Sequence, residues 1–311
     1  MSKTIPRALW FRFLHRLAMA IPIALASHIA HGRNAPAHPA PEQAQRPVAS
    51  ENYNREPLIL LSNAAVVVSG RTGAIMHAKN IDSVQPIASI TKLMTALVIL
   101  DTNVSLDGTV RIETDDIDVE RSSKSKLRIG EVLARRDLLR LSLLASENRA
   151  ASALARSIPG GTPAFVAAMN RKAHALGMDN THFVDASGLS SANVSTARDL
   201  AKLVAAAANS AVIKEFSTTP QVSLTRLDTG HETIFRNTNL LVRRDNGWDI
   251  HLSKTGYINE AGHCLVMQAS IDHQLVNIVL LDSWGRYSRI GDANRIKKWL
   301  QSKARVAMGI Q

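Results

Sequence analysis

The sequence predicts an α+β fold in which an antiparallel sheet is flanked by helices and carries a helical subdomain. Three observations predict it: β-branched apolar runs lie near both ends of the chain, a mostly helical stretch separates them, and a helix follows the last run. This order gives one sheet built from both ends, with the helices inserted between its strands. The domain is expected to cover residues 58–311, a length that can bury one substantial core.

The residues before this domain have a different composition. Residues 1–26 hold four cations and no acid, and they end in an apolar run with small residues at Ala24 and Ala26. This pattern is typical of a secretory signal peptide, with cleavage expected after Ala26 or, as second choice, after Ala30. The run is shorter than the roughly 20 residues of a spanning helix, which disfavours the alternative of an uncleaved membrane anchor. Residues 27–57 are rich in Pro and Ala and are expected to be a linker.

Strands are predicted where β-branched runs border turn residues. An N-terminal hairpin is expected from residues 64–69 and 74–78, around a turn that contains two glycines. Val110 and Ile112 give weaker strand signals. A later block holds the remaining predicted strands, which cover residues 222–227, 250–255, 264–271 and 275–281. The last two are expected to form a second hairpin around Asp272 and His273.

Helices are predicted where apolar residues recur every three or four positions. The expected helices cover residues 89–100, 133–144, 162–177, 196–208 and 288–304. The last one is basic and amphipathic. We expect it to close the fold with a solvated basic face, and a peripheral membrane contact is the alternative.

Charge and cysteine content limit the function classes. The chain has 37 Lys and Arg against 26 Asp and Glu, and its formal net charge of +11 would fall to +7 if residues 1–26 were removed. Such a charge fits a nucleic acid, an anionic surface or an exported basic enzyme. Aromatic residues make up only 4% of the chain, few for a protein that stacks on bases, and no nucleic acid partner is expected. The single cysteine, Cys264, excludes an internal disulfide and is expected to be buried.

The first of three short motifs is Ser89-Ile-Thr-Lys92, at the start of a predicted helix. Residues three apart share a helix face, so Ser89 Oγ and Lys92 Nζ can meet. A serine hydroxyl becomes a nucleophile when a base takes its proton, and a lysine can be that base when desolvation and a second cation lower its pKa. The motif therefore predicts a serine acyl enzyme with Lys92 as its base.

Ser146-Glu147-Asn148, which follows a predicted apolar helix, is the second motif. Ser146 would relay a proton between two lysines and the leaving group. Asn148 would hold Lys92 and the substrate amide through its carboxamide.

The third motif, Lys254-Thr255-Gly256, ends a predicted strand. Lys254 would supply the second cation, and with Thr255 it would bind a substrate carboxylate. Gly256 would let a peptide approach the strand edge as an added strand. The backbone N–H groups of Ser89 and Tyr257 would form an oxyanion hole.

Each motif alone is weak evidence for a function, because it is short enough to occur by chance. The three motifs in this order, however, occur in penicillin-binding proteins and class A β-lactamases. Longer strings are more specific, and they occupy residues 87–92, 145–150, 188–196, 235–239, 253–257 and 261–267. Through them the chain resembles, over about residues 60–300, the low-molecular-mass penicillin-binding proteins of the D-alanyl-D-alanine endopeptidase type, serine D,D-peptidases of family S11 like penicillin-binding protein 7.

The resemblance implies a transpeptidase-like fold, shared with the serine β-lactamases, in which Ser89 is acylated and Lys92 is its base. It also implies hydrolysis of D-alanyl–meso-diaminopimelyl cross-links in periplasmic peptidoglycan. The partners would be peptidoglycan stem peptides and β-lactams, which bind covalently. Glu147 stands where β-lactamases usually have Asp, which fits the endopeptidase group. The chain is expected to lack the extra β-rich C-terminal domain of many D-alanyl-D-alanine carboxypeptidases.

Two other functions remain open: a D-alanyl-D-alanine carboxypeptidase and a non-catalytic penicillin-binding sensor. A class A β-lactamase would need a carboxylate to activate the deacylating water. Between the second and third motifs the only glutamates are Glu215 and Glu232, neither in a suitable predicted position, so slow hydrolysis of the penicilloyl-enzyme is expected. No metal or cofactor is expected, because the sequence after His231 lacks the second histidine of a zinc-protease motif.

Overall fold

The computed structural model describes residues 57–225, 230, 232–244 and 246–307. The chain divides into two units, residues 1–54 and 55–311, and all the described residues lie in the second. The predicted signal peptide and all but the last residue of the predicted linker lie outside the described residues, so both stay predictions.

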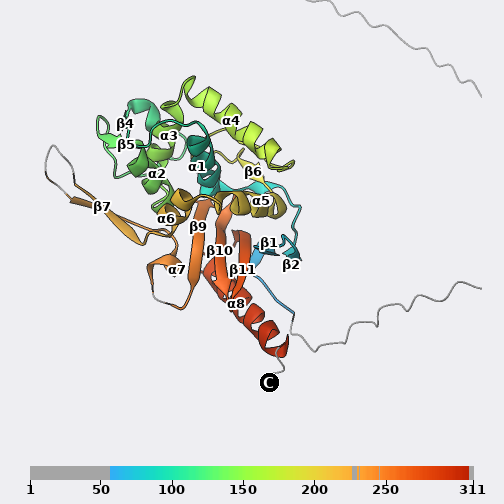
Figure 1. Ribbon diagram of the computed structural model, residues 1–311. Coiled ribbons are helices and arrows are strands. Elements are labelled where there is room, and N and C mark those ends of the chain that lie inside the picture. Colours follow the sequence, from blue (N-terminus) through green and yellow to red (C-terminus); the bar gives the residue numbers. More distant parts are fainter. Residues whose placement is uncertain (1–56, 226–229, 231, 245, 308–311) are drawn as a thin grey trace, which may run out of the picture. The chain divides into compact units, whose positions relative to one another are not determined.

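One antiparallel sheet of five strands organises the second unit (Figure 1). The strands are β1 (Ser62–Ser69), β2 (Ile75–Lys79), β9 (Asp249–Ile258), β10 (Gly262–Ile271) and β11 (Gln274–Ser283). Their order is β2-β1-β11-β10-β9, and β1 pairs with β11 in a register that sets Val66 opposite Val279. The predicted sheet, built from both ends of the domain, is confirmed. β9 carries the third motif and lies at an edge of this sheet.

The turn between β10 and β11 has the expected residues. Asp272 and His273 both adopt positive φ angles, 46° and 63°. Two consecutive residues of this kind form the hairpin turns whose twist matches the flanking strands, and Asp tolerates this conformation better than most residues.

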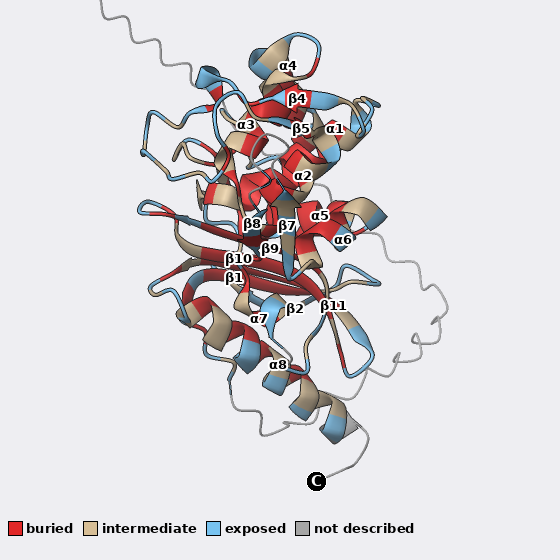
Figure 2. Ribbon diagram, turned by 90° about the vertical axis from the view of Figure 1, so that its left-hand side faces the viewer, coloured by how far each residue is buried: buried red, intermediate tan, exposed pale blue. Residues whose placement is uncertain are grey.

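Both faces of the sheet are covered (Figure 2). The helix α8 (Ser288–Ala307) packs on one face through Ala293, Ile296 and Leu300, which are buried with residues of β10 and β11. These apolar contacts agree with the closing helix that the sequence predicts. The helical subdomain covers the other face. Because side chains of a strand alternate between faces, Val66 joins the core on the subdomain side and Val67 joins the core under α8.

The helical subdomain is inserted between β2 and β9. Its helical elements are the 3-10 turns η1 (Ala88–Ile90) and η2 (Thr114–Asp116) and the helices α1 (Thr91–Asp101), α2 (Arg135–Leu144), α3 (Asn148–Arg156), α4 (Gly161–Ala175), α5 (Ala197–Ala207), α6 (Ala211–Thr218) and α7 (Leu240–Arg243). Three small antiparallel pairs join β3 (Gln85–Pro86) to β6 (Val194–Ser195), β4 (Thr109–Arg111) to β5 (Val132–Ala134), and β7 (Gln221–Thr225) to β8 (Glu232–Arg236). Among the described residues, no helix is both long and apolar enough to cross a bilayer.

Several boundaries differ from the sequence-based expectations. The helix predicted from Leu133 begins at Arg135, because Val132–Ala134 pairs with β4. The helices α3 and α6 were not expected, since nine and eight residues give too short an apolar pattern. The strand predicted over 222–227 is described only as far as Thr225.

Candidate active site

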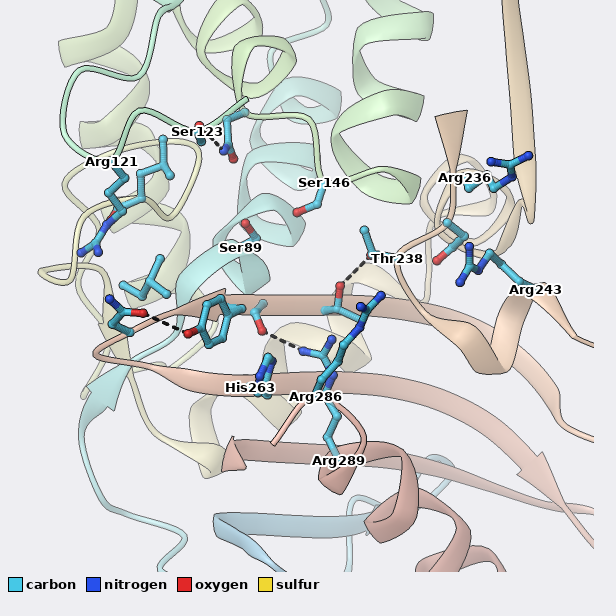
Figure 3. A pocket seen from close by; sticks show the side chains of 18 residues that line it. Ser89, Arg121, Ser123, Ser146, Arg236, Thr238, Arg243, His263, Arg286 and Arg289 are labelled. Carbon is cyan, nitrogen blue, oxygen red and sulfur yellow. Dashed lines mark hydrogen bonds between the residues drawn. The ribbon is translucent and has the colours of Figure 1, made fainter. Parts of the chain in front are cut away.

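Ser89 lies in the turn η1 (Figure 3). Lys92 lies one helical turn further on, at the start of α1. Lys92 Nζ donates to Ser89 Oγ at 2.9 Å, to Asn148 Oδ1 at 2.7 Å and to the carbonyl oxygen of Ser187. The predicted contact between residues three apart is confirmed. Burial lowers the pKa of Lys92 to about 7, against the carboxylates of Asp185 and Glu147, which raise it. An amine with this pKa is about half neutral at pH 7 and can accept a proton.

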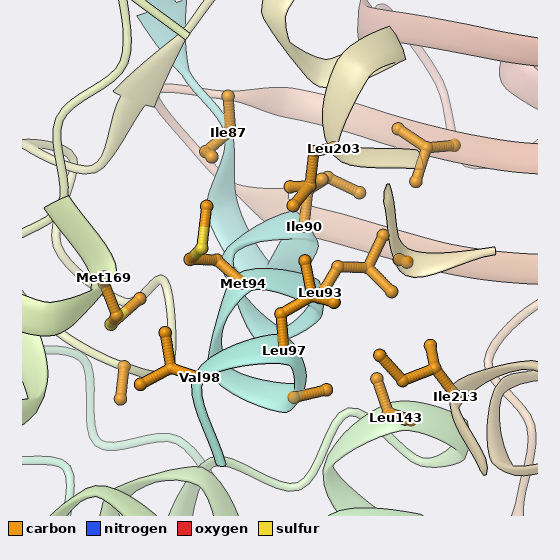
Figure 4. Close-up of a cluster of buried hydrophobic side chains, with 14 of the residues drawn as sticks. Ile87, Ile90, Leu93, Met94, Leu97, Val98, Leu143, Met169, Leu203 and Ile213 are labelled. Atoms are coloured by element: carbon orange, nitrogen blue, oxygen red, sulfur yellow. The ribbon is translucent and has the colours of Figure 1, made fainter. Parts of the chain in front are cut away.

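The helix α1 holds these two residues on a rigid base. It runs through the core of the subdomain, and residues 91–99 are all buried (Figure 4). Leu93, Met94 and Val98 are packed among apolar side chains of the surrounding helices, such as Met169 of α4 and Leu203 of α5. A helix that is apolar on all sides must be buried. The lysine at its start is therefore desolvated.

Two glycines fit closely against the turn that presents Ser89. A Cβ on Gly188 would lie 2.0 Å from the carbonyl oxygen of Ala88, and a Cβ on Gly256 would lie 2.9 Å from that of Ile87. Ala88 itself has a φ of +47°, a strained conformation for a residue with a side chain. The missing side chain of Gly256 therefore also makes room for the protein's own nucleophile segment, and the expected approach of a substrate peptide stays a prediction.

Across the cleft, Lys254 of β9 is 1% exposed. Its Nζ donates to Ser146 Oγ and to the carbonyl oxygen of Thr255, both at 2.8 Å. Burial lowers the pKa of Lys254 well below its ordinary value, and the positive charges of Lys92 and Arg289 lower it further. Ser146 has a φ of +59°, at the bend between α2 and α3. Its contact is thus with Lys254, and the described residues show no hydrogen bond from it to Lys92.

The second motif also positions a neighbouring loop. Asn148 accepts from Lys92 through Oδ1 and donates from Nδ2 to Ser123 Oγ at 2.9 Å. Glu147 is nearly buried, and its Oε1 accepts from Ser125 Oγ at 2.7 Å and from the backbone N–H of Lys126 at 2.9 Å. Its carboxylate holds the segment that contains Ser123, a role that the motif did not reveal.

A second loop supplies the third partner of Lys92. Asp185 Oδ1 accepts from the backbone N–H groups of Ser187 and Gly188, both at 2.6 Å, and its Oδ2 accepts from that of Ser190 at 2.9 Å. These bonds fix the Ser187 carbonyl that Lys92 contacts. The contact of Lys92 with the Ser187 carbonyl was not predicted, because a backbone carbonyl leaves no residue-type signal.

Thr255 and Gly256 have partners that were also missed. Thr255 Oγ1 donates to Thr238 Oγ1 at 2.6 Å. Arg289 of α8 reaches under the strand, and its Nη1 donates to the carbonyl oxygens of Gly256 and Cys264, both at 2.8 Å. Burial lowers the pKa of Arg289 to about 10. Cys264 is fully buried, as expected, and burial raises its pKa to about 11.

A cleft of about 690 Å³ opens in front of Ser89. Tyr257 lines it, is 53% exposed, and stacks its ring on His263 with centroids 4.3 Å apart. The lining contains neither Asp nor Glu, and it includes five arginines: Arg121, Arg236, Arg243, Arg286 and Arg289. The cleft therefore suits an anionic ligand. No group of three or more His, Cys, Asp or Glu is placed to hold a metal ion in the part of the chain that the structure describes.

The sequence of the chain matches a known family over residues 51–284, the peptidase S11 family, described as D-alanyl-D-alanine carboxypeptidase. The chain belongs to this family. It is 47% identical to the D-alanyl-D-alanine endopeptidase of Pseudomonas aeruginosa, with 78% of each protein covered. It is 44% identical to the D-alanyl-D-alanine endopeptidase of Escherichia coli, again with 78% of each protein covered.

Solved structures of similar sequence have the same architecture. The crystal structure of the Streptomyces K15 DD-transpeptidase matches with a TM-score of 0.71 and 30% identity, over 78% of this chain and 97% of that one. Penicillin-binding protein D2 of Listeria monocytogenes, in its cefotaxime-bound form, matches with a TM-score of 0.68 and 30% identity, over 79% of this chain and 99% of that one. The expected transpeptidase-like fold is confirmed.

The position of the glutamates sets this S11 peptidase apart from a class A β-lactamase. Glu215 lies on α6 and forms an ion pair with Arg140 at 3.6 Å. Glu232 is exposed at the start of β8. Neither residue lines the cleft in front of Ser89, so neither is placed to activate a water there.

Proposed function

We propose that this protein is a serine D-alanyl-D-alanine endopeptidase that hydrolyses D-alanyl–meso-diaminopimelyl cross-links of peptidoglycan and is acylated by penicillin. The observation that carries the proposal is the pair of buried lysines, each hydrogen-bonded to a serine: Lys92 to Ser89 at 2.9 Å and Lys254 to Ser146 at 2.8 Å. Support also comes from the two close relatives, which are both named D-alanyl-D-alanine endopeptidase.

Acylation begins when neutral Lys92 accepts the proton of Ser89 Oγ, which attacks the D-alanyl carbonyl carbon. The backbone N–H groups of Ser89 and Tyr257 stabilise the oxyanion. In support, the Ser89 nitrogen lies only 3.2 Å from the position of a Cβ on Gly256, the residue before Tyr257. As the edge strand of its sheet, β9 also offers free backbone groups to a bound peptide.

Cleavage requires a proton for the departing nitrogen. Ser146 Oγ delivers it, and the hydrogen bond from Lys254 at 2.8 Å lets the serine recover one. The carbon–nitrogen bond breaks, the amine leaves and Ser89 stays acylated. Lys92 then releases the Ser89 proton to solvent, from which Lys254 regains its own. A water attacks the ester while neutral Lys92 accepts its proton, and Lys92 returns this proton to Ser89 Oγ as the ester C–O bond breaks, so that Ser89 is regenerated.

Substrate position depends on the remaining motif residues. Lys254 and Thr255 hold the carboxylate next to the scissile bond, and the hydrogen bond from Thr255 to Thr238 at 2.6 Å orients that hydroxyl. Asn148 contacts the substrate amide while its Oδ1 keeps Lys92 in place at 2.7 Å.

We further infer that the protein works in the periplasm after export. Residues 1–26 have the basic start, the apolar run and the small residues of a signal peptide. Peptidoglycan lies outside the cytoplasm, so that export and the proposed substrate agree.

The test is to incubate the mature protein with labelled penicillin and with purified cross-linked muropeptide dimers, next to the variant Ser89→Ala. The wild-type protein should take up label and release monomers, and the variant should do neither. Label without cleavage would favour a penicillin-binding sensor. Cleavage of monomeric pentapeptide alone would identify a carboxypeptidase.

A further inference from the structure

The two ends of the cleft carry different charge arrangements (Figure 3). At one end, Arg121 forms an ion pair with Glu260 at 3.0 Å and donates from Nε to the carbonyl oxygen of Leu189. At the other end, Arg236 and Arg243 lie beyond Thr238. Both are exposed, and neither forms a salt bridge or a side-chain hydrogen bond with any residue that the structure describes.

These two arginines come from separate elements that meet at the cleft. Arg236 is the last residue of β8, and Arg243 is the last residue of α7. Both also line an adjoining hollow of about 330 Å³ with Pro220, Gln221 and Arg244. Guanidinium groups that line one hollow with no acidic partner among the described residues repel, and a bound carboxylate would relieve this repulsion through charge-assisted hydrogen bonds.

The chemistry of the site fixes which part of a substrate faces them. The departing nitrogen must lie near Ser146, which is hydrogen-bonded to Lys254. The leaving group therefore extends from Ser89 toward Ser146 and Thr238, and further along this side it meets the two arginines.

We propose that Arg236 and Arg243 bind carboxylates of the leaving peptide strand and thereby select cross-linked substrates. This inference rests on the proposed function. The D-alanine released by a carboxypeptidase carries one carboxylate, the one next to the scissile bond. The strand released from a cross-link carries that group and further free carboxylates on its own stem. Only such a strand is long enough and acidic enough to use this end of the cleft.

The experiment compares three substrates for the wild-type protein, for Arg236→Gln, for Arg243→Gln and for the double variant. The substrates are a cross-linked muropeptide dimer, the same dimer with the free carboxylates of its leaving strand amidated except the one next to the scissile bond, and a labelled penicillin. Arg71→Gln is the matched control, because Arg71 is exposed in the turn after β1 and does not line this cleft.

On the unmodified dimer, the double variant should lose about tenfold or more in kcat/KM, as expected for lost hydrogen bonds to charged groups. The wild-type protein should lose a similar factor on the amidated dimer, while the double variant should cleave both dimers at the same rate. Acylation by penicillin, which has no leaving strand, should change less than about twofold, and Arg71→Gln should match the wild type on all three.

Two results would overturn the proposal. One is a double variant that cleaves the unmodified dimer at the wild-type rate. The other is an equal loss on the dimer and on penicillin, since that would mean general damage to the site. If the wild-type protein cleaved no dimer at all, the proposed endopeptidase function would fail first, and the selection proposed here would fall with it.

Discussion

The substitution Glu147→Gln should shift the pH dependence of Ser89 acylation to lower pH. The Glu147 carboxylate raises the pKa of Lys92, against the burial that lowers it to about 7. The amide oxygen of glutamine can still accept the hydrogen bonds from Ser125 Oγ and from the backbone N–H of Lys126, so that the loop with Ser123 keeps its position. It removes the negative charge, and the protonated form of Lys92 loses that stabilisation. The pKa of Lys92 must therefore fall.

The size of the effect in the wild-type protein follows from the pKa of about 7. About a tenth of Lys92 is neutral at pH 6, about half at pH 7 and about nine tenths at pH 8. The acylation rate constant should therefore rise by about tenfold from pH 6 to pH 8 and then level off. The variant should reach the same plateau at lower pH, so that it is faster than the wild type at pH 6.

The assay is the second-order rate constant for labelling by a fluorescent penicillin, measured from pH 5 to pH 9 with reactions stopped at short times. Circular dichroism over the same range checks that both proteins remain folded. A midpoint that stays unchanged in the variant, or that moves to higher pH, would refute the assignment of Lys92 as the titrating base.

Three further predictions follow from packing and charge. Gly188→Ala should abolish penicillin labelling and lower the free energy of unfolding in urea by more than about 2 kcal/mol, because the added Cβ would lie 2.0 Å from the carbonyl oxygen of Ala88. The control is Gly73→Ala, which should keep full labelling. Gly73 has a similar φ of +71°, but its added Cβ would have no atom within 4 Å. Asp292→Asn should cost about 3 kcal/mol in the same unfolding measurement, since the buried Asp292 carboxylate accepts from the N–H of Ser62 at 2.7 Å and from its hydroxyl at 2.6 Å, and an unchanged midpoint would contradict this. The penicilloyl-enzyme should hydrolyse slowly, because no Asp or Glu lines the described cleft, and rapid turnover of penicillin in a spectrophotometric assay would disprove that.

Much of the fold was predictable because its strongest signals are local. The i,i+3 spacing placed Ser89 against Lys92, and the apolar runs located β1, β10 and β11 within a few residues. The need of Lys92 for a second cation then pointed to Lys254. Each of these signals is carried by residue type and spacing, which a sequence shows directly.

The rest of the site was not predictable because it depends on contacts between distant segments. The carbonyl of Ser187 contacts Lys92 only because Asp185 folds its loop, and a carbonyl is present in every residue. Arg289 reaches Gly256 from the final helix, 33 residues away in the sequence. Gly256 was identified as part of the third motif. Its close packing against the segment that carries the nucleophile could not be predicted from that motif.

The pairing of β1 with β11 also bears on how an active molecule is made. Val66 of β1 lies opposite Val279 of β11. β1 therefore cannot pair with β11 until nearly the whole chain has left the ribosome. Such distant pairing makes folding slow and leaves it incomplete during synthesis. The nucleophile is translated long before Lys254 and Arg289, the two cations that border its turn from β9 and α8. An unfinished chain thus contains Ser89 without an active site, and a hydrolase of this design stays inert until its last strands are complete.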